Sequence, residues 1–153
     1  MQIISTSKAF GGTLSKANHF STLLGCDMKF SIFVPCSLGP LAAIYFLSGL
    51  TCNEDNFMTK GGALKQAAAL GLVLIAPDTS PRGLNIPGED DDWDFGTGAG
   101  FYVDATVDAY KGYQMYSYIT QELPRLVSQH FPVDPLRTSI FGHSMVHLLY
   151  SHL

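Results

Sequence analysis

The sequence predicts an α/β fold with a mostly parallel sheet, and three observations lead to that prediction. Two short runs, residues 41–47 and 72–76, are apolar throughout, as expected of strands that a parallel sheet buries on both faces. A helix-like segment, 60–70, separates them, which gives the strand–helix–strand order of a parallel crossover. A further short run, 138–141, is predicted as a strand and leads directly into a Gly-x-Ser sequence.

Local signals support the elements in the first half of the chain. Residues 28–34 place apolar side chains at alternate positions and end at Pro35, which predicts a strand with one face more buried than the other. The Ala- and Lys-rich segment 60–70 ends at Gly71, where the C-cap of a helix is expected.

The second half begins with a glycine- and proline-rich stretch, residues 78–112. A loop of this length is uncommon inside a compact domain and is often functional. Residues 113–130 then place apolar side chains on one helical stripe, and Pro124 should kink or split that helix. A turn bracketed by Pro132 and Pro135 is expected to follow.

The composition indicates a globular protein and limits its partners. The 153 residues are 46% hydrophobic, which is enough apolar material for one core. The formal net charge of −4 and the scattered Lys and Arg residues argue against nucleic acid as a partner. We expect no membrane partner either, because the apolar runs are too short to span a bilayer and the N-terminus has no signal-peptide pattern. Three cysteines, Cys26, Cys36 and Cys52, without metal-type spacing indicate reduced thiols, a cytoplasmic protein and no zinc site.

The most informative segment is residues 140–145. A strand that runs into Gly142-His143-Ser144 has the nucleophile-elbow layout of α/β-hydrolases, in which a strained turn lifts the serine hydroxyl beyond the carboxyl edge of the sheet. The following helix N-terminus and the next backbone N–H help to stabilise an oxyanion in such sites. The loop after an early strand donates the other oxyanion N–H, and residues 48–52 follow the buried run 41–47.

Five segments together resemble the S-formylglutathione hydrolase family, also called esterase D. They are residues 48–52 (SGLTC), 76–83 (APDTSPRG), 93–105 (WDFGTGAGFYVDA), 131–135 (FPVDP) and 139–145 (SIFGHSM). The resemblance extends over about residues 10–145. It implies an α/β-hydrolase fold and a cytoplasmic serine thioesterase that hydrolyses S-formylglutathione to formate and glutathione, a step of formaldehyde detoxification. Carboxylesterase activity on small esters is implied as a side activity, with no cofactor and no metal.

The matching motifs imply roles for four residues. Ser144 takes the position of the nucleophile, and the backbone N–H groups of Leu50 and Met145 take the oxyanion positions. Cys52 matches a cysteine near the active site that is not itself the nucleophile.

The resemblance stops after Met145, where the family continues with two glycines and this chain has a divergent tail, residues 146–153. Val146 stands at the second glycine position and should clash or push the helix away from the strand. No Asp or Glu follows Ser144, and we expect neither His147 nor His152 to replace the triad histidine, so the triad acid and histidine are missing from this chain. The sequence therefore predicts a single truncated domain, 1–153, whose fold is incomplete at the C-terminal side through splicing, a frameshift or a gene-model error.

Alternative interpretations remain beside the enzyme. The chain could be a catalytically inactive truncated product, and a homodimer is left open. A cation- or nucleotide-binding module is less favoured, because the acidic stretch 89–94 lacks the glycine and glutamate positions of a calcium loop, and Phe101 replaces the third glycine of a nucleotide loop in 96–101. Asp78 at a strand end is expected to be a cap rather than a triad acid.

Overall fold

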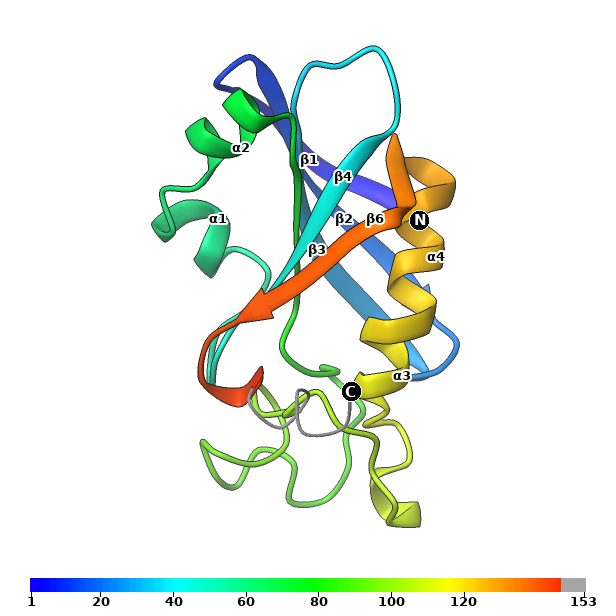
Figure 1. Cartoon of the computed structure of the whole chain (residues 1–153). Coiled ribbons are helices and arrows are strands. Elements are labelled where there is room, and N and C mark those ends of the chain that lie inside the picture. The colour runs from blue at the N-terminus through cyan, green and yellow to red at the C-terminus, as the bar shows by residue number, and fades with distance from the viewer. Residues whose placement is uncertain (147–153) are drawn as a thin grey trace.

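The computed structural model describes residues 1–146 and contains one six-stranded mixed sheet with the order β1-β2-β3-β5-β4-β6 (Figure 1). β4 pairs parallel with β5 and with β6, whereas the β1–β2, β2–β3 and β3–β5 pairs are antiparallel. The predicted parallel pairing of runs 41–47 and 72–76 is confirmed, but the sheet as a whole is mixed rather than mostly parallel. The strands are β1 (Gln2–Ala9), β2 (Gly12–Ser21), β3 (Cys26–Val34), β4 (Leu41–Leu47), β5 (Val73–Pro77) and β6 (Val133–Gly142).

The antiparallel half of the sheet is an N-terminal meander whose third strand, β3, confirms the predicted strand 28–34, whereas the sequence patterns did not predict β1 and β2. Its first hairpin turns at Phe10 and Gly11, which both have positive φ, 48° and 77°. Two successive residues of positive φ are typical of the tight turns whose twist matches that of paired antiparallel strands. β1 is exposed along nearly its whole length, so it carries no buried apolar pattern that would mark it as a strand.

The predicted helix 60–70 is confirmed only as the shorter helix α2 (Leu64–Leu70), and a separate helix that was not predicted, α1 (Asn56–Lys60), ends where the predicted range begins. Gly61 and Gly62 lie in the break, and glycine is a poor helix former. The predicted C-cap is confirmed, since Gly71 has φ 66° and its N–H donates to the carbonyls of Ala67 and Ala68.

The predicted helix 113–130 is a continuous helical segment of three parts: α3 (Met115–Ser117), a π-helical turn η2 (Tyr118–Glu122) and α4 (Leu123–His130). Pro124 cannot donate a helical hydrogen bond, and the π turn lies directly before it, where the Leu123 N–H reaches back to the Tyr118 carbonyl. The apolar stripe faces the core as predicted, with Met115, Tyr118 and Leu123 fully buried.

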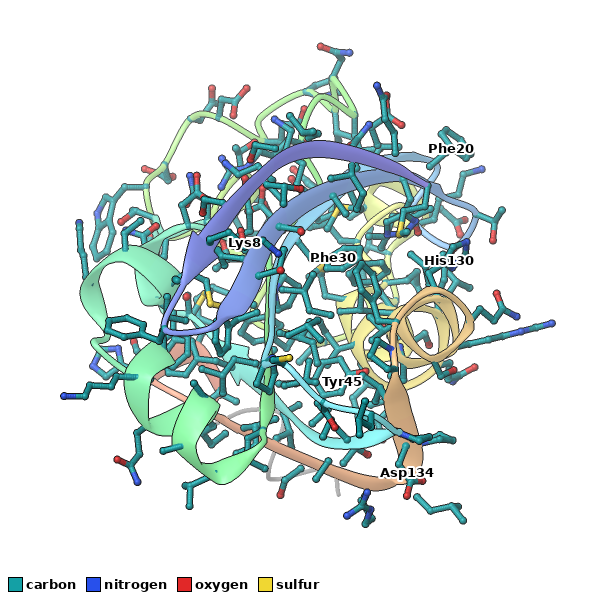
Figure 2. All side chains as sticks on the ribbon, turned by 90° about the horizontal axis from the view of Figure 1, so that it is seen from above. Lys8, Phe20, Phe30, Tyr45, His130 and Asp134 are labelled. Atoms are coloured by element: carbon teal, nitrogen blue, oxygen red, sulfur yellow. The ribbon has the colours of Figure 1, made fainter. Side chains whose placement is uncertain are left out.

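The helices cover both faces of the sheet and leave its carboxyl end to loops. Figure 1 shows α1 and α2 on one side and the α3–α4 segment on the other, with the long loop crossing the end of the sheet where β4 and β6 finish. In Figure 2, Phe30 and Tyr45 lie inside the molecule, whereas Asp134 lies at its edge. The long loop contains one short 3-10 helix, η1 (Asp108–Tyr110).

β6 is longer than the predicted strand 138–141, because it begins at Val133 and includes Pro135. The register of its pairing with β4 is irregular between Leu41 and Ala43, so the expected proline turn is an irregularity within the strand. β6 is the last strand of the sheet, and no strand within residues 1–146 pairs with its outer edge.

A buried histidine connects β2 to the helical segment. His19 Nε2 lies 2.9 Å from Tyr118 Oη, and Nδ1 lies 3.2 Å from the Phe20 carbonyl oxygen. A neutral ring with its proton on Nδ1 satisfies both contacts, donating to Phe20 and accepting from Tyr118. Burial lowers the pKa of His19 below its ordinary value of 6.5.

This lowered pKa predicts a pH-dependent stability. As the pH falls below 6.5, the unfolded chain takes up a proton on His19 before the folded protein does, so the free energy of unfolding decreases. The slope for this one proton is at most about 1.4 kcal/mol per pH unit. We expect His19→Gln to abolish this decrease in the free energy of unfolding, measured by urea unfolding from about pH 7 to about pH 5, a range that spans the ordinary histidine pKa. The exposed His130 provides the matched control, because His130→Gln should leave the pH dependence that comes from His19 unchanged. An equal slope in His19→Gln and the wild type would contradict the assignment.

Candidate active site

Ser144 stands on a strained turn directly after β6. It is exposed and has φ 63°, a conformation that costs energy for residues other than glycine. It opens the short 3-10 helix η3 (Ser144–Val146). The His143 N–H donates to the Leu47 carbonyl at 3.1 Å, so the turn is fixed against the end of β4.

The turn depends on the close approach of the two strand ends at Gly142. A Cβ placed on Gly142 would lie 2.4 Å from the Leu47 carbonyl oxygen, closer than any side chain could tolerate. On its other side the same Cβ would lie 3.1 Å from Cβ of Val146. Val146 is buried in the core, so the expected clash is not seen: the space that Gly142 leaves open accommodates the branched side chain.

The loop after β4 touches the serine. A Cβ on Gly49 would lie 3.1 Å from Cβ of Ser144 and 3.2 Å from Nδ1 of His143. Within residues 1–146, the N–H of the next residue, Leu50, donates to no protein acceptor. Met145 is the second residue of η3, and N–H groups in the first turn of a helix have no partner within that helix. These two N–H groups are the ones for which an oxyanion role is predicted.

The segment 51–52 is held by the long loop and by the residues after β5. Thr51 has φ 65°, and its N–H donates to the Gly98 carbonyl at 3.0 Å. The Cys52 carbonyl accepts a hydrogen bond of 2.6 Å from Thr79 Oγ1 and one of 3.2 Å from Arg82 Nη2. Cys52 is thus fixed through its backbone, and the lining of the cleft by its thiol stays a prediction.

Asp78 has the structural role that the sequence favoured. Its Oδ1 accepts from the Thr79 N–H at 2.7 Å, as a cap does. Arg82 binds both carboxylate oxygens, Nε to Oδ2 at 2.7 Å and Nη2 to Oδ1 at 2.8 Å. The side chain of Asp78 is therefore fully engaged in holding Arg82, which in turn holds the Cys52 carbonyl.

A buried tyrosine donates a hydrogen bond to the same loop after β4. Tyr102 is fully buried, has φ 53°, and donates its hydroxyl to the Ser48 carbonyl at 2.7 Å. Burial raises the pKa of Tyr102 well above its ordinary value, so this hydroxyl remains a donor across the usable pH range.

The backbone of the glycine-rich stretch 96–100 is hydrogen-bonded to other parts of the protein. The N–H groups of Thr97, Gly98 and Ala99 donate to the Glu89 carbonyl, to Ser80 Oγ and to the Gly96 carbonyl, respectively. None of these three N–H groups is therefore available to a phosphate, which argues against a nucleotide loop.

The described residues, 1–146, contain neither a side-chain cluster that could hold a metal ion nor a helix that could cross a membrane. No three His, Cys, Asp or Glu side chains of this part of the chain gather as a metal site requires. None of its helices is both long and apolar enough to cross a membrane. His147 and His152 lie outside the described residues, as does the rest of the divergent tail beyond Val146.

The strand order, the helices on both faces and the strained serine turn at the carboxyl end of β6 define the α/β-hydrolase class. A sequence model of the Esterase family, described as "Putative esterase", matches residues 21–146. The chain belongs to this esterase family.

Within that family the resemblance to S-formylglutathione hydrolases is confirmed. The chain is 58% identical to the S-formylglutathione hydrolase of Bos taurus over 145 residues and 49% identical to that of Arabidopsis thaliana over 146 residues. It covers 51% of each of these proteins, and they align with 93% of the chain. The solved structure of an S-formylglutathione hydrolase from Agrobacterium tumefaciens superposes with a TM-score of 0.91 at 49% identity, covering 95% of this chain and 53% of that one. The chain thus spans about half the length of the relatives it matches.

Sequence reasoning missed the residues that brace the loop. Arg82, Thr79, Tyr102 and Gly98 all lie inside the motifs that carry the resemblance, but their contacts join segments far apart in the chain. One signal was available: Asp78 and Arg82 are four residues apart and of opposite charge.

The Tyr102 contact makes a prediction about stability. Tyr102→Phe leaves the buried Ser48 carbonyl without its donor and should cost about 1–3 kcal/mol of unfolding free energy. Tyr45 is the matched control, because its buried hydroxyl has no hydrogen-bond partner among the described residues, so Tyr45→Phe should be neutral or slightly stabilising. Urea unfolding of Tyr102→Phe and Tyr45→Phe measures the difference in their free energies of unfolding. Equal losses would show that the hydrogen bond from Tyr102 to the Ser48 carbonyl does not stabilise the protein.

The strain at Ser144 makes a second prediction. Glycine adopts positive φ without penalty, so Ser144→Gly should be more stable than Ser144→Ala by about 1 kcal/mol. Both variants lack the hydroxyl, so their difference isolates the backbone. Ser139 is also exposed but lies in β6, and there Ser139→Gly should be less stable than Ser139→Ala by about 0.5–1 kcal/mol. Thermal unfolding that ranks Ser144→Ala above Ser144→Gly would show that the turn is unstrained.

Proposed function

We propose that this chain supplies the nucleophile and the oxyanion hole of a serine thioesterase that hydrolyses S-formylglutathione to formate and glutathione. Ser144 is the nucleophile in this proposal, and the backbone N–H groups of Leu50 and Met145 form the oxyanion hole. The observation that carries it is the exposed Ser144 at φ 63°, with the backbone of Gly49 against its side chain. The similarity to S-formylglutathione hydrolases of cattle and Arabidopsis supports the choice of substrate.

The proposed reaction has two stages. Ser144 Oγ attacks the thioester carbonyl and loses its proton to a base, and the carbonyl oxygen becomes an oxyanion bound by the two N–H groups. The C–S bond then breaks, glutathione leaves as its thiol after taking up a proton, and the formyl group remains as an ester on Ser144. Water attacks this ester through a second oxyanion, which releases formate and restores the serine hydroxyl.

The base and its acid partner are not supplied by residues 1–146 in this proposal. Asp78 is committed to Arg82, and residues 145–153 contain no Asp or Glu. A polypeptide of residues 1–153 alone should therefore hydrolyse S-formylglutathione about 10⁴–10⁶-fold more slowly than an enzyme with a complete triad, because loss of triad members costs that much in rate. The alternative to an enzyme is therefore a catalytically inactive truncated product that carries the nucleophile without its base and acid.

The cellular setting is part of the proposal. The three cysteines are free thiols, one of them buried, which fits a cytoplasmic protein. The partner is the small-molecule thioester, and a homodimer is compatible with it.

A chimera tests the proposed chemistry. Residues 1–145 of this chain are joined to the remaining C-terminal half of the bovine S-formylglutathione hydrolase, which is 58% identical over the shared part. We expect the chimera to hydrolyse S-formylglutathione and residues 1–153 alone to remain at background. Ser144→Ala in the chimera should lower kcat by about 10⁴-fold or more.

Ser139→Ala is the control for a serine on the same strand that has no proposed role, and it should leave the rate of the chimera unchanged. Turnover that survives Ser144→Ala would remove Ser144 from the mechanism. Rapid turnover by residues 1–153 alone would show that this chain carries its own base.

A further inference from the structure

The strand β6 has the pairing of an interior strand but the position of an edge strand. It pairs parallel with β4, and the strands of parallel sheets are buried on both faces. β5, the other parallel partner of β4, is buried at every residue, whereas residues 135–139 of β6 are all exposed. No strand within residues 1–146 pairs with the outer edge of β6, and an unpaired edge of this kind is a template for pairing with another chain.

A hollow of about 380 Å³ lies beside β6, between this strand and the helical segment η2–α4. Its lining includes Thr138 of β6, Thr120 of η2 and Tyr45 of β4. The Tyr45 hydroxyl is buried and has no hydrogen-bond partner within the described part of the chain. A buried hydroxyl without an acceptor is uncommon in a folded protein, and a segment that fills the hollow can accept from it.

The opposite face of the sheet carries a partly covered aromatic cluster at β6. Tyr45 and Phe46 are consecutive in β4, so they point to opposite faces. Phe141 packs edge-to-face on Phe46 with ring centroids 4.9 Å apart, and Phe46 stacks on Phe57 of α1. Phe141 nevertheless remains 42% exposed. β6 therefore presents accessible side chains on both faces next to its unpaired edge, as a domain core that is cut in half would do.

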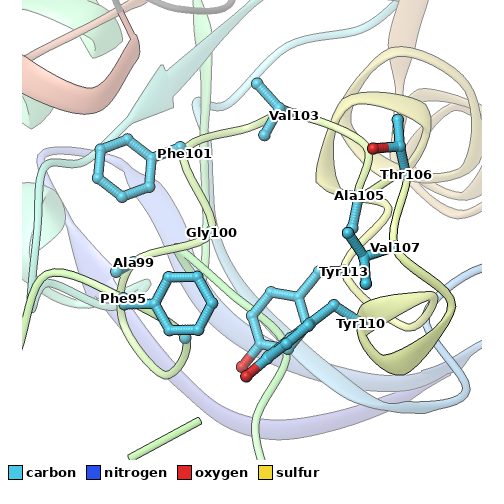
Figure 3. A pocket seen from close by; sticks show the side chains of 11 residues that line it. Phe95, Ala99, Gly100, Phe101, Val103, Ala105, Thr106, Val107, Tyr110 and Tyr113 are labelled. Carbon is cyan, nitrogen blue, oxygen red and sulfur yellow. The ribbon is translucent and has the colours of Figure 1, made fainter. Parts of the chain in front are cut away.

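The cavity of the long loop provides a contrast. Its volume is about 310 Å³, and one continuous segment, residues 95–113, supplies all of its walls (Figure 3). Its two tyrosine hydroxyls have protein acceptors, since Tyr110 donates to the Pro87 carbonyl at 3.3 Å and Tyr113 to Glu89 Oε2 at 3.1 Å. This cavity is formed and satisfied within one loop, whereas the hollow beside β6 lies at the edge of the sheet.

We propose that β6, together with the hollow and the Phe141 cluster on its two faces, binds the C-terminal half of an S-formylglutathione hydrolase as a separate polypeptide. The chain covers 51% of the bovine enzyme, and it superposes on 53% of the Agrobacterium tumefaciens enzyme with a TM-score of 0.91. The remaining half of such an enzyme fits as the occupant, because it begins just beyond the end of β6 and belongs to a protein with the same exposed edge. Interfaces that resemble a divided core hold two chains together without a covalent connection.

The association would complete one active site from two polypeptides. Ser144 lies two residues beyond Gly142, where β6 ends, so a chain that pairs with the edge of β6 comes close to the nucleophile. This chain would supply Ser144 and the oxyanion N–H groups, and the second polypeptide would supply the triad acid and histidine. The activity of the pair rests on the proposed function, whereas the binding does not.

Co-purification tests the binding without requiring catalysis. Residues 1–153 are produced in the same cells as the bovine C-terminal half used in the chimera, which carries an affinity tag. We expect the two polypeptides to elute as an equimolar complex. Hydrogen–deuterium exchange then compares this complex with residues 1–153 alone. Exchange of the amides of β6 should slow at least about tenfold in the complex, and exchange in β1, at the opposite edge of the sheet, should not change.

Two threonines on the two edge strands provide a matched pair of variants. Thr138 on β6 and Thr6 on β1 are both exposed. Thr138→Arg places a charge in the hollow and should reduce the recovered complex at least about tenfold, while Thr6→Arg should leave it unchanged. If Thr138→Arg does not fold, Phe141→Glu provides the second test on the other face of β6, and the exposed Phe20 of β2 provides its control, Phe20→Glu.

Turnover separates this inference from the proposed chemistry. The co-purified pair should hydrolyse S-formylglutathione, and Ser144→Ala in the pair should abolish this activity. A complex that forms while neither it nor the chimera turns over would remove the proposed function and support the binding. An active chimera whose two halves do not co-purify when separate would overturn the binding. Equal recovery with Thr138→Arg and Thr6→Arg would overturn the assignment of the surface. Slow exchange of β6 already in residues 1–153 alone would do the same, because the tail or a second copy would then cover the edge.

Discussion

The close approach of the ends of β4 and β6 is the constraint on which the candidate site depends. Only a residue without a side chain fits at Gly142, where an added Cβ would lie 2.4 Å from the Leu47 carbonyl oxygen. The hydrogen bond from the His143 N–H to that same carbonyl then fixes the direction of the next residue. Ser144 therefore leaves the sheet where the loop from β4 also turns, and the backbone of Gly49 meets it there.

Strain and bracing occur together at this end of the sheet. Four residues with side chains, Thr51, Phe101, Tyr102 and Ser144, have positive φ here. Such conformations persist only where surrounding contacts hold them. The contacts come from hydrogen bonds that the long loop and the residues after β5 make to the carbonyls of Ser48 and Cys52 and to the N–H of Thr51. The long loop, 78–112, thus holds the short loop after β4, residues 48–52, in place.

The sequence predicted those features whose signal lies in neighbouring residues. The buried strands β4 and β5 are uniformly apolar, Gly71 marks a helix end, and Gly142-His143-Ser144 marks the turn. The strand β1 was missed because both of its faces are exposed and its side chains follow no burial pattern. The break between α1 and α2 contains Gly61 and Gly62, and the helix predicted from the Ala- and Lys-rich composition of 60–70 did not take these two glycines into account. The brace from Arg82 to Cys52 joins residues thirty positions apart, so only the folded chain reveals it.

The pairing of β4 with β6 also has a consequence for the order of folding. The β1–β3 meander joins neighbouring segments, but Ala43 pairs with Thr138, across most of the chain. Closing so long a loop costs entropy before any contact is gained, so such pairings form late. The serine turn, which exists only after β6 has joined β4, should be among the last features to assemble. A partly folded chain would then carry the bracing loop before Ser144 has taken its place beside Gly49.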